Sequence, residues 1–268
     1  MDSNTALFAL FGDPVSHSKG PLMHNHALCY TGFNGAYLAF AVKDIAKALE
    51  SVKVLGIKGV SITIPHKEKV IPFVDEMDEL ALAAGAVNTI VNRDNRLFGY
   101  NTDTYGAVAP LRQFGPLAGK KVCIFGAGGA AKAVAAGLKK EKVVISIANR
   151  TENKGAALAE KVNGVFVSLE KAEEKEFDIV INTTPLGMVP DVDRTPVTKD
   201  FFKRGMIVMD IVYNPLKTKM LREAEERGCT IIDGVSMFVN QGAAQFALFT
   251  GLKAPVEEMR NIVLESFK

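Results

Sequence analysis

The segment Gly119–Leu138, "GKKVCIFGAGGAAKAVAAGL", decides the fold class that the sequence predicts. Its first part, Lys121–Phe125, is a run of β-branched and other apolar residues typical of a buried strand. A glycine turn follows, and the alanine-rich remainder has the composition of a helix. A strand that passes through a glycine turn into a helix is typical of a Rossmann unit, so we expect a parallel α/β domain here.

The turn itself, "GAGGAA" at Gly126–Ala131, fits the dinucleotide-binding pattern G-x-G-x-x-A. Gly126 would allow the tight turn, Gly128 would let the backbone approach a pyrophosphate, and Ala131 would pack the helix on the strand. The helix amino terminus would face the anion. A glycine-rich turn without a ligand is the alternative, but the strand and helix around it favour a dinucleotide. We expect cofactor contacts from Gly126, Ala127, Gly128, Gly129 and Ala130.

The choice between NAD and NADP depends on the residues about twenty positions further on, where an NAD site presents an acid to the ribose hydroxyls. This chain has "NRTENK" there, at 149–154. Arg150 and Lys154 are cations suited to the 2′-phosphate of NADP, and one acid lies between them. Asn149 and Thr151 add neutral donors. A helix start capped by Thr151 is the structural alternative and is compatible with phosphate binding. The pattern favours NADP.

Apolar runs alternate with helical patterns along the chain, which indicates α/β architecture with parallel strands. We expect a substrate-binding domain at 1–102, completed by 235–268, and a Rossmann domain at 103–234. The last helical patterns, 238–249 and 255–267, have no strand to pair with, so we expect them to pack back on the N-terminal domain. The expected strands are 5–11, 36–42, 60–64, 87–92, 97–100, 121–125, 143–148, 178–182 and 207–212.

The composition argues against several classes of protein. With 268 residues, 48% hydrophobic and 23% charged, the chain is long enough to bury a core and is typical of a globular protein. A net charge of +2 gives no broad basic field, so neither nucleic acid nor a membrane is expected as a partner. The three cysteines, Cys29, Cys123 and Cys229, lack metal-ligand spacing, so we expect buried, reduced thiols and no metal. The N-terminal segment has no signal-peptide or transit-peptide pattern. We therefore expect a cytoplasmic protein, with a plastid protein lacking its transit peptide as the alternative.

Candidate substrate-binding residues follow the strands of the N-terminal domain. Ser16 and Ser18 lie in a loop before a predicted helix, where two hydroxyls suit an anion, although such residues most often only cap the helix. Lys67 stands just past the strand "VSITI" and a proline, at the carboxyl end where α/β sheets bind ligands. It is either a solvated cation or the chemical centre. Asn88 and Asp103 come next, and taken singly they have structural alternatives, as a turn residue and as an acid complementing a helix dipole.

These motifs occur together in a particular order: "GDPVSHSKGP", "SITIPHKE", "GAVNTI", "GYNTD", "GAGGAAKA", "NRT", "NTTPLGM", "YNPLKT" and "MFVNQ". The set resembles shikimate dehydrogenase over essentially the whole chain. The residues within these motifs are most similar to those of the dehydrogenase half of the plant dehydroquinate dehydratase/shikimate dehydrogenase. The resemblance implies an N-terminal α/β substrate domain and a C-terminal Rossmann domain, with substrate and NADP meeting in the cleft between them. It also implies reversible, NADP-dependent reduction of 3-dehydroshikimate to shikimate, a step toward chorismate and the aromatic amino acids.

The resemblance further implies roles for individual residues. Lys67 and Asp103 would be the catalytic pair, in which Lys67 supplies the proton and Asp103 orients it. The substrate carboxylate would be held by Ser16, Ser18 and Tyr213. Ring hydroxyls would be bound by Thr63, Asn88, Asp103 and Gln241. On the cofactor side the resemblance adds Thr183, Gly234 and Met237, although a methionine near a helix start is more often simple core packing.

Two positions depart from the family pattern, and two other functions stay open. Gly20 stands where serine is frequent, and Ser61 stands where bacterial members have asparagine. Ser61 could shorten a hydrogen bond to the substrate and so change the preference for shikimate over quinate.

One alternative function is a quinate/shikimate dehydrogenase that uses NAD, against which Asn149 and Arg150 argue. The other is a metabolite-sensing protein without turnover, against which the presence of both catalytic residues argues. The sequence leaves open whether the protein is a monomer or a homodimer.

Overall fold

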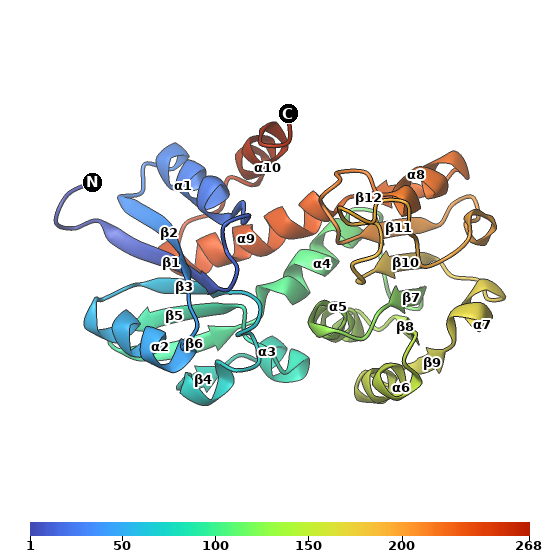
Figure 1. Ribbon diagram of the computed structural model, residues 1–268, viewed down its shortest axis with the longest axis horizontal. Coiled ribbons are helices and arrows are strands. Elements are labelled where there is room, and N and C mark those ends of the chain that lie inside the picture. Colours follow the sequence, from blue (N-terminus) through green and yellow to red (C-terminus); the bar gives the residue numbers. More distant parts are fainter. The chain divides into compact units, whose positions relative to one another are not determined.

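The computed structural model describes all residues, 1–268, and the chain forms two compact units. Unit 1 comprises Met1–Gly106 and Val239–Lys268, and unit 2 comprises Ala107–Phe238. Each unit is built around a six-stranded sheet with helices packed on it (Figure 1). Two helices, α4 (Thr102–Arg112) and α9 (Gly234–Thr250), begin in one unit and end in the other.

The sheet of unit 1 has the strand order β2-β1-β3-β5-β6-β4. β1 pairs in parallel with β2 and β3, but β5 runs antiparallel to both β3 and β6. The expectation of parallel strands throughout is therefore wrong here. β5 and β6 form a hairpin whose turn residues, Asp94 and Asn95, both have positive φ, a conformation that Asp and Asn tolerate. The strands are β1 (Ala6–Gly12), β2 (Gly35–Ala41), β3 (Gly59–Ile62), β4 (Glu76–Met77), β5 (Thr89–Arg93) and β6 (Arg96–Tyr100).

Helices cover the sheet of unit 1, and the C-terminal part of the chain belongs to this unit as predicted. Residues Val239–Lys268 group with it, and α10 packs against α1. One face of the sheet packs against α2 through Phe11, Val60 and Ile62, which belong to one buried apolar cluster. The helices of unit 1 are α1 (Gly20–Tyr30), α2 (Ile45–Val54), α3 (Glu79–Ala84), the first part of α4, most of α9 and α10 (Val256–Glu265), with a 3-10 turn at Ile71–Phe73.

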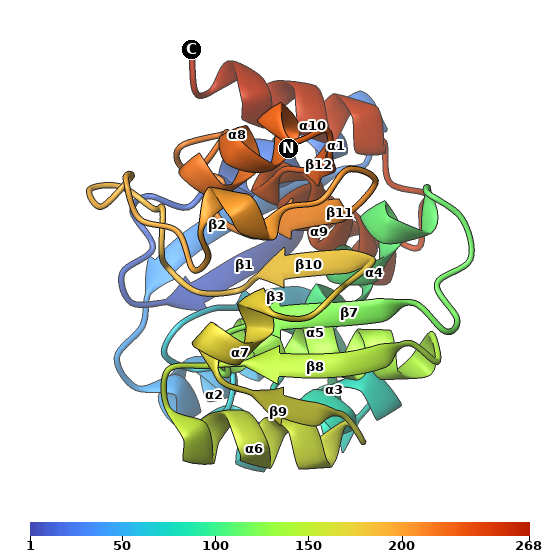
Figure 2. The same ribbon diagram turned by 90° about the vertical axis from the view of Figure 1, so that its right-hand side faces the viewer.

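Unit 2 is a doubly wound parallel sheet with the order β12-β11-β10-β7-β8-β9. Figure 2 shows these strands side by side. Val122 and Ile124 of β7 face an apolar cluster with α5 and α6, whereas Cys123 and Phe125 face a second cluster with α7 and α8. The strand is buried on both faces, which is why its sequence is continuously apolar. The strands are β7 (Lys121–Phe125), β8 (Val144–Ala148), β9 (Val165–Val167), β10 (Ile179–Asn182), β11 (Ile207–Asp210) and β12 (Thr230–Ile232).

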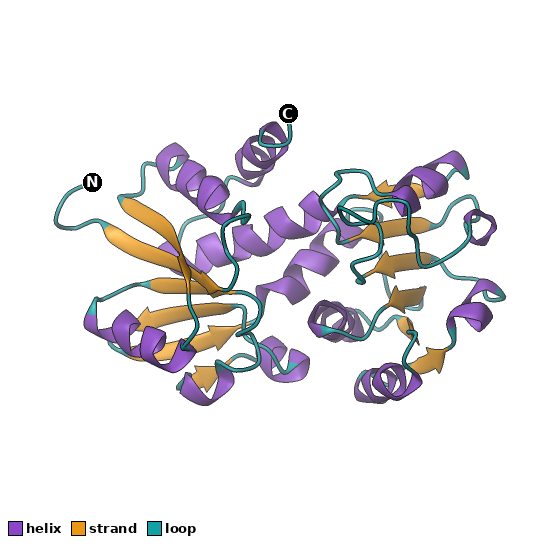
Figure 3. Ribbon diagram, in the orientation of Figure 1, coloured by secondary structure: helices purple, strands orange, loops and turns teal.

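The helices of unit 2 lie on both faces of its sheet, as the secondary-structure colouring of Figure 3 shows. They are α5 (Gly129–Lys140), α6 (Glu152–Lys161), α7 (Leu169–Glu173) and α8 (Lys219–Glu226), with a 3-10 turn at Lys199–Phe201. The expectation of a buried thiol is confirmed for Cys123 and Cys229 but is wrong for Cys29, which is exposed near the end of α1. None of the helices is both long and apolar enough to span a membrane.

Candidate active site

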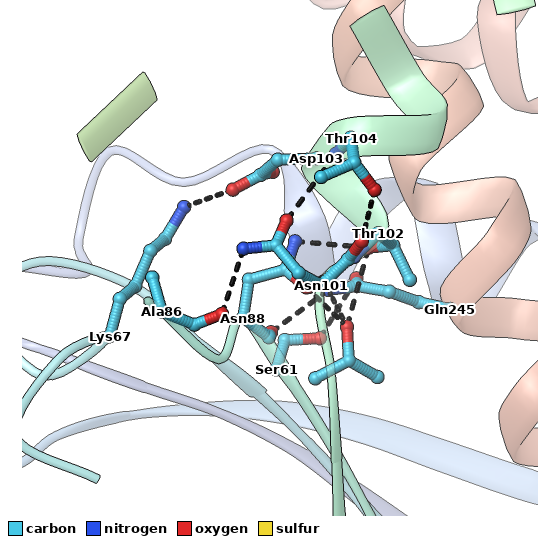
Figure 4. A network of polar contacts seen from close by, with 10 residues as sticks. Ser61, Lys67, Ala86, Asn88, Asn101, Thr102, Asp103, Thr104 and Gln245 are labelled. Carbon is cyan, nitrogen blue, oxygen red and sulfur yellow. Dashed lines mark hydrogen bonds and ion pairs between the residues drawn. The ribbon is translucent and has the colours of Figure 1, made fainter. Parts of the chain in front are cut away.

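Lys67 and Asp103 form an ion pair in unit 1 (Figure 4). Lys67 lies in the loop after β3, and Asp103 lies in the first turn of α4. The Lys67 Nζ atom is 2.7 Å from Oδ2 of Asp103, and the two side chains are 30% and 13% exposed. Because an ammonium carries three donors and Asp103 takes one, Lys67 has donor capacity left for another oxygen. The pair is accessible to a ligand yet held in one geometry.

Asn88 lies just before β5 and is fixed by contacts with the start of α4. Its Oδ1 accepts hydrogen bonds from the backbone N–H of Thr102 and from the hydroxyl of Thr89, both at 2.8 Å. Its Nδ2 donates to Oγ1 of Thr102 at 2.9 Å. Because a backbone N–H can only donate, the carbonyl of the amide must face Thr102. The orientation of Asn88 is thereby settled, and its Nδ2 keeps a second N–H for another acceptor.

Gln245 joins this polar cluster from α9, and the sequence pattern does not single it out. It is buried, and its Nε2 donates to the carbonyl of Asn88 at 3.2 Å and to the hydroxyl of Thr89 at 3.0 Å. Its Oε1 accepts from the hydroxyl of Ser61 at 2.9 Å. Ser61, expected as a possible substrate contact, is therefore buried and committed to Gln245 in this structure. A glutamine one turn after Gln241 carries no sequence signal that it would fill this position.

His24 of α1 lies on the other side of Gln245. Its ring stacks on Tyr37 with centroids 4.3 Å apart, and its Nε2 is 3.3 Å from Oε1 of Gln245. Burial lowers the pKa of His24 to about 4, while the hydrogen bond to Gln245 opposes this effect. The imidazole is consequently neutral at pH 7. Since Oε1 of Gln245 can only accept, Nε2 of His24 carries the proton.

The remaining predicted substrate residues of unit 1 lie in loops and on α9. Ser16 is exposed and Ser18 is half-buried in the loop between β1 and α1. The Ser18 hydroxyl accepts from the backbone N–H of Gly20 at 3.1 Å, so the capping alternative applies to this residue. Thr63 directly follows β3, and Gln241 is half-buried on α9. Tyr213 belongs to unit 2.

The glycine turn of unit 2 has the backbone that a dinucleotide site requires. Gly126 has a φ of 113°, and a Cβ atom there would lie 2.6 Å from Oγ1 of Thr183. A Cβ at Gly128 or Gly129 would meet nothing within 4 Å, so the surface over the start of α5 is open. The N-cap residue, Gly128, provides no side-chain cap and the first turn holds no acid. The free N–H groups at this helix start therefore suit an anionic pyrophosphate.

The candidate 2′-phosphate residues follow β8, which ends at Ala148. Arg150, Thr151 and Lys154 are exposed, and Nδ2 of Asn149 donates to the backbone carbonyl of Thr151 at 2.8 Å. Thr151 occupies the N-cap position of α6, but its side chain makes no capping hydrogen bond. The capping alternative for Thr151 is thus absent from the structure, and its hydroxyl stays available to a ligand.

The other cofactor-side residues of unit 2 are packed against one another or against the sheet. The Thr183 hydroxyl donates to the carbonyl of Phe125 at 2.6 Å. Gly234 lies so close to the backbone at Val212 that a Cβ would be 2.5 Å from its carbonyl, which explains the glycine. Met237 is buried in the apolar cluster on the α5 face, as its structural alternative predicts. The ring of Tyr213 is tilted by 37° against that of Phe238, with centroids 5.4 Å apart, and burial raises the pKa of its phenol.

No group of three or more His, Cys, Asp or Glu side chains is arranged to hold a metal ion. The polar groups gathered around Lys67 and Asp103 are amides and hydroxyls. An ammonium beside amide groups in unit 1 suits proton transfer, and the open glycine turn in unit 2 suits a dinucleotide that carries hydride.

Comparison with known proteins agrees with this arrangement. Residues 10–90 match the shikimate dehydrogenase substrate binding domain, residues 109–213 match the shikimate / quinate 5-dehydrogenase family, and residues 234–264 match the shikimate 5′-dehydrogenase C-terminal domain. The shikimate dehydrogenase (NADP(+)) of Moorella thermoacetica is 45% identical, over 98% of this chain and 94% of its own.

Two solved structures extend the comparison to the fold. A shikimate dehydrogenase in complex with NADP+ has a TM-score of 0.96 at 39% identity, covering 100% of this chain and 98% of its own. The shikimate 5-dehydrogenase of Thermus thermophilus, in complex with NADP(H) and shikimate, has a TM-score of 0.91 at 34% identity, covering 98% and 100%. Fold and site together define a dehydrogenase with a Rossmann cofactor unit. The chain belongs to the shikimate dehydrogenase family.

Proposed function

We propose that this protein catalyses the reversible, NADP-dependent reduction of 3-dehydroshikimate to shikimate. The observation that carries the proposal is the 2.7 Å contact between Lys67 and Asp103, next to the ordered amide of Asn88. Family membership supports the reaction, and this geometry supplies the groups that it needs. NADPH, when bound, supplies the hydride that reaches the carbonyl carbon.

Lys67 acts in this proposal as the proton donor. As the carbonyl carbon accepts the hydride, negative charge develops on its oxygen, and an ammonium group beside that oxygen stabilises the charge and then transfers a proton. The product is the C–H and O–H of a secondary alcohol, so protons and electrons balance. Asp103 keeps the ammonium in place, and it also accepts a hydrogen bond from a neighbouring ring hydroxyl. In the oxidation direction Lys67 accepts the proton instead.

Asn88 and the hydroxyl residues position the substrate in the same proposal. Nδ2 of Asn88 donates one N–H to Thr102, and in this proposal its second N–H binds the oxygen of a ring hydroxyl. Thr63 and Gln241 bind further hydroxyls. The substrate carboxylate is held by the hydroxyls of Ser16 and Ser18 near the start of α1, with Tyr213 as a third donor.

The cofactor proposal rests on the open turn of Gly126–Ala130 and on the charges that follow β8. The N–H groups at the start of α5 bind the pyrophosphate, while Asn149, Arg150, Thr151 and Lys154 bind the 2′-phosphate of the adenosine ribose. Thr183, Gly234 and Met237 line the nicotinamide side. Arg150 follows β8 where an NAD enzyme would present an acid, so NADP is favoured over NAD.

Quinate is the second candidate substrate, because the family model that matches residues 109–213 covers shikimate and quinate enzymes. Quinate carries an additional hydroxyl on the carboxylate-bearing carbon, so the two substrates differ at the end held by Ser16 and Ser18. A third possibility, a sensor without turnover, keeps the binding residues but predicts no reaction.

We place the protein in the cytoplasm because its three cysteines are free thiols. We also propose a monomer or homodimer without nucleic-acid or membrane partners.

One assay separates these functions. The absorbance of NADPH and NADH at 340 nm is followed with shikimate, quinate and their dehydro forms, each at several concentrations. We expect turnover with shikimate and NADP+, with kcat/KM at least tenfold above that for NAD+ or quinate. Faster turnover of quinate with NAD+ would replace the proposal by its rival. Binding of shikimate by calorimetry without any turnover would establish the sensor.

A further inference from the structure

A buried carboxylate in unit 2 has no part in the mechanism above. Asp210 is the last residue of β11, is 0% exposed, and pairs in register with Asn182, the last residue of β10. Burial raises the pKa of its carboxyl to about 6, and this effect outweighs the hydrogen bonds from the neutral groups of Thr218, Val212 and Asn182, which lower it. A buried carboxyl without a cation costs free energy unless it makes good hydrogen bonds. Its presence at the carboxyl end of the parallel strands, where ligands bind, therefore needs a reason.

The hydrogen bonds of Asp210 close the loop at residues 211–218. Its Oδ1 accepts from the backbone N–H of Val212 at 3.0 Å, near the start of the loop. Its Oδ2 accepts from the hydroxyl of Thr218 at 2.7 Å, at the end of the loop and the N-cap of α8. Tyr213 lies between these two anchors. One carboxylate thus fixes both ends of the segment that carries Tyr213.

The same carboxylate is joined to a second loop through Asn182. Nδ2 of Asn182 donates to Oδ1 of Asp210 at 3.0 Å, and Oδ1 of Asn182 accepts from the hydroxyl of Thr184 at 2.7 Å and from its N–H at 3.0 Å. Nδ2 also lies 3.3 Å from the carbonyl of Leu186. The loop that carries Thr183 is therefore shaped around Asn182. The two loops also meet directly, since the N–H of Val189 donates to the carbonyl of Asn214 at 3.2 Å.

We propose that Asp210 is a positioning residue. Together with Asn182 it fixes the positions of the two loops that carry Thr183 and Tyr213 relative to each other. This inference rests on the proposed function, because Tyr213 is assigned there to the substrate and Thr183 to the cofactor. A network of this kind holds its members only while every donor and acceptor is satisfied. Loss of the carboxylate leaves three donors without their acceptor, and the loops lose their common anchor.

The experiment compares Asp210→Ala with Asp210→Asn. The asparagine keeps an oxygen for Asn182 and Val212 and loses only the acceptor for Thr218, whereas alanine loses all three contacts. We expect Asp210→Ala to raise the KM for shikimate about tenfold and the dissociation constant of NADPH several-fold, the latter measured by nucleotide fluorescence. Asp210→Asn should restore most of both. Asp178→Asn is the matched control, since Asp178 directly precedes β10 and accepts from the N–H of Lys121 at the amino ends of the strands in the same sheet. It should leave both constants unchanged.

A double-mutant cycle with Tyr213→Phe separates positioning from general stability. If Asp210 acts through Tyr213, Asp210→Ala should add little to the KM for shikimate in the Tyr213→Phe background. Independent, multiplying effects on KM would overturn the inference, as would a lower Tm with unchanged KM and NADPH affinity. If Asp210→Ala does not fold, Thr218→Val, which removes the hydroxyl donor to Oδ2 of Asp210, takes its place in the same test. An inactive parent enzyme would refute the proposed function. The role of Asp210 would still be tested in that case, because the affinity for NADPH is measured without turnover.

Discussion

Replacing Lys67 by alanine tests the centre of the mechanism. The change removes the proton donor and leaves Oδ2 of Asp103, 2.7 Å away in the parent, without its cation. General acid and base groups contribute about 10² to 10⁴ in rate, so we expect kcat to fall by about a thousandfold, or about 4 kcal/mol of activation free energy. KM for shikimate should change far less, because the carboxylate and the other hydroxyls keep their partners. Steady-state NADPH formation at pH 7, with a rapid-quench check that chemistry limits turnover, measures both constants.

The control for this variant lies two residues further on. Lys69 is exposed in the same loop, so Lys69→Ala removes an equal charge without touching Asp103 and should leave kcat within twofold. Asp103→Asn tests whether the pair acts as a unit. If it does, the double variant Lys67→Ala/Asp103→Asn should be scarcely slower than Lys67→Ala alone, because residues that share one role are strongly non-additive. Parental kcat in Lys67→Ala would refute the assignment, and Lys67 would then be a solvated cation beyond a strand.

Three further predictions concern substrate, cofactor and stability. Ser16→Ala should lower kcat/KM for shikimate by about ten- to a hundredfold, since a hydrogen bond to a charged group contributes about 1.5 to 3 kcal/mol, and an unaltered value would place the carboxylate elsewhere. Arg150→Ala/Lys154→Ala should raise the KM for NADP+ without improving NAD+, because no acid replaces them; a double variant with the parent's ratio of kcat/KM for NADP+ over NAD+ would move the 2′-phosphate to other groups. His24 stays neutral in the fold, with a pKa of about 4 against 6.5 in the unfolded chain. The unfolded state alone takes up the proton between these values, so the stability that His24 contributes is complete above about pH 6.5 and decreases by about 3 kcal/mol as pH falls to 4. Urea denaturation across this range should show a shallower pH dependence in His24→Gln, and parallel curves would contradict the neutral imidazole.

The parts of the fold that could be predicted are those with a local physical signature. The run at Lys121–Phe125 is apolar because both faces of β7 are covered, and the glycine at 126 is required by a positive φ and a close neighbour. The hairpin of β5 and β6 carries a signal as well, the adjacent Asp94 and Asn95, which tolerate positive φ. A reading based on alternating strands and helices overlooks that signal, and so predicts a parallel strand.

The sequence predicts which charged residues belong to the site but not how they contact one another. The order of the motifs indicates both Lys67 and Asp103, which are separated by 36 positions. Their 2.7 Å contact depends on how the loop after β3 faces α4. Gln245 could not be found in the same way, because its partners come from α1, β3 and β5 and no pattern along the chain connects them. The buried Asp210 has no signal along the chain for the same reason, since its hydrogen bond to Asn182 joins two neighbouring strands.

The amide of Asn88 has a consequence for how the substrate range of this enzyme can evolve. Its oxygen receives the first N–H of α4, the helix whose next residue is Asp103. Asn88→Asp would keep that acceptor but lose both N–H donors, while shorter residues would also leave the N–H of Thr102 unsatisfied inside the protein. A change at Asn88 that suits a new ligand would therefore disturb the carboxylate that pairs with Lys67. Adaptation to a related cyclic acid should instead proceed through Ser16, Ser18 and their loop, where a side chain can change without displacing Asp103.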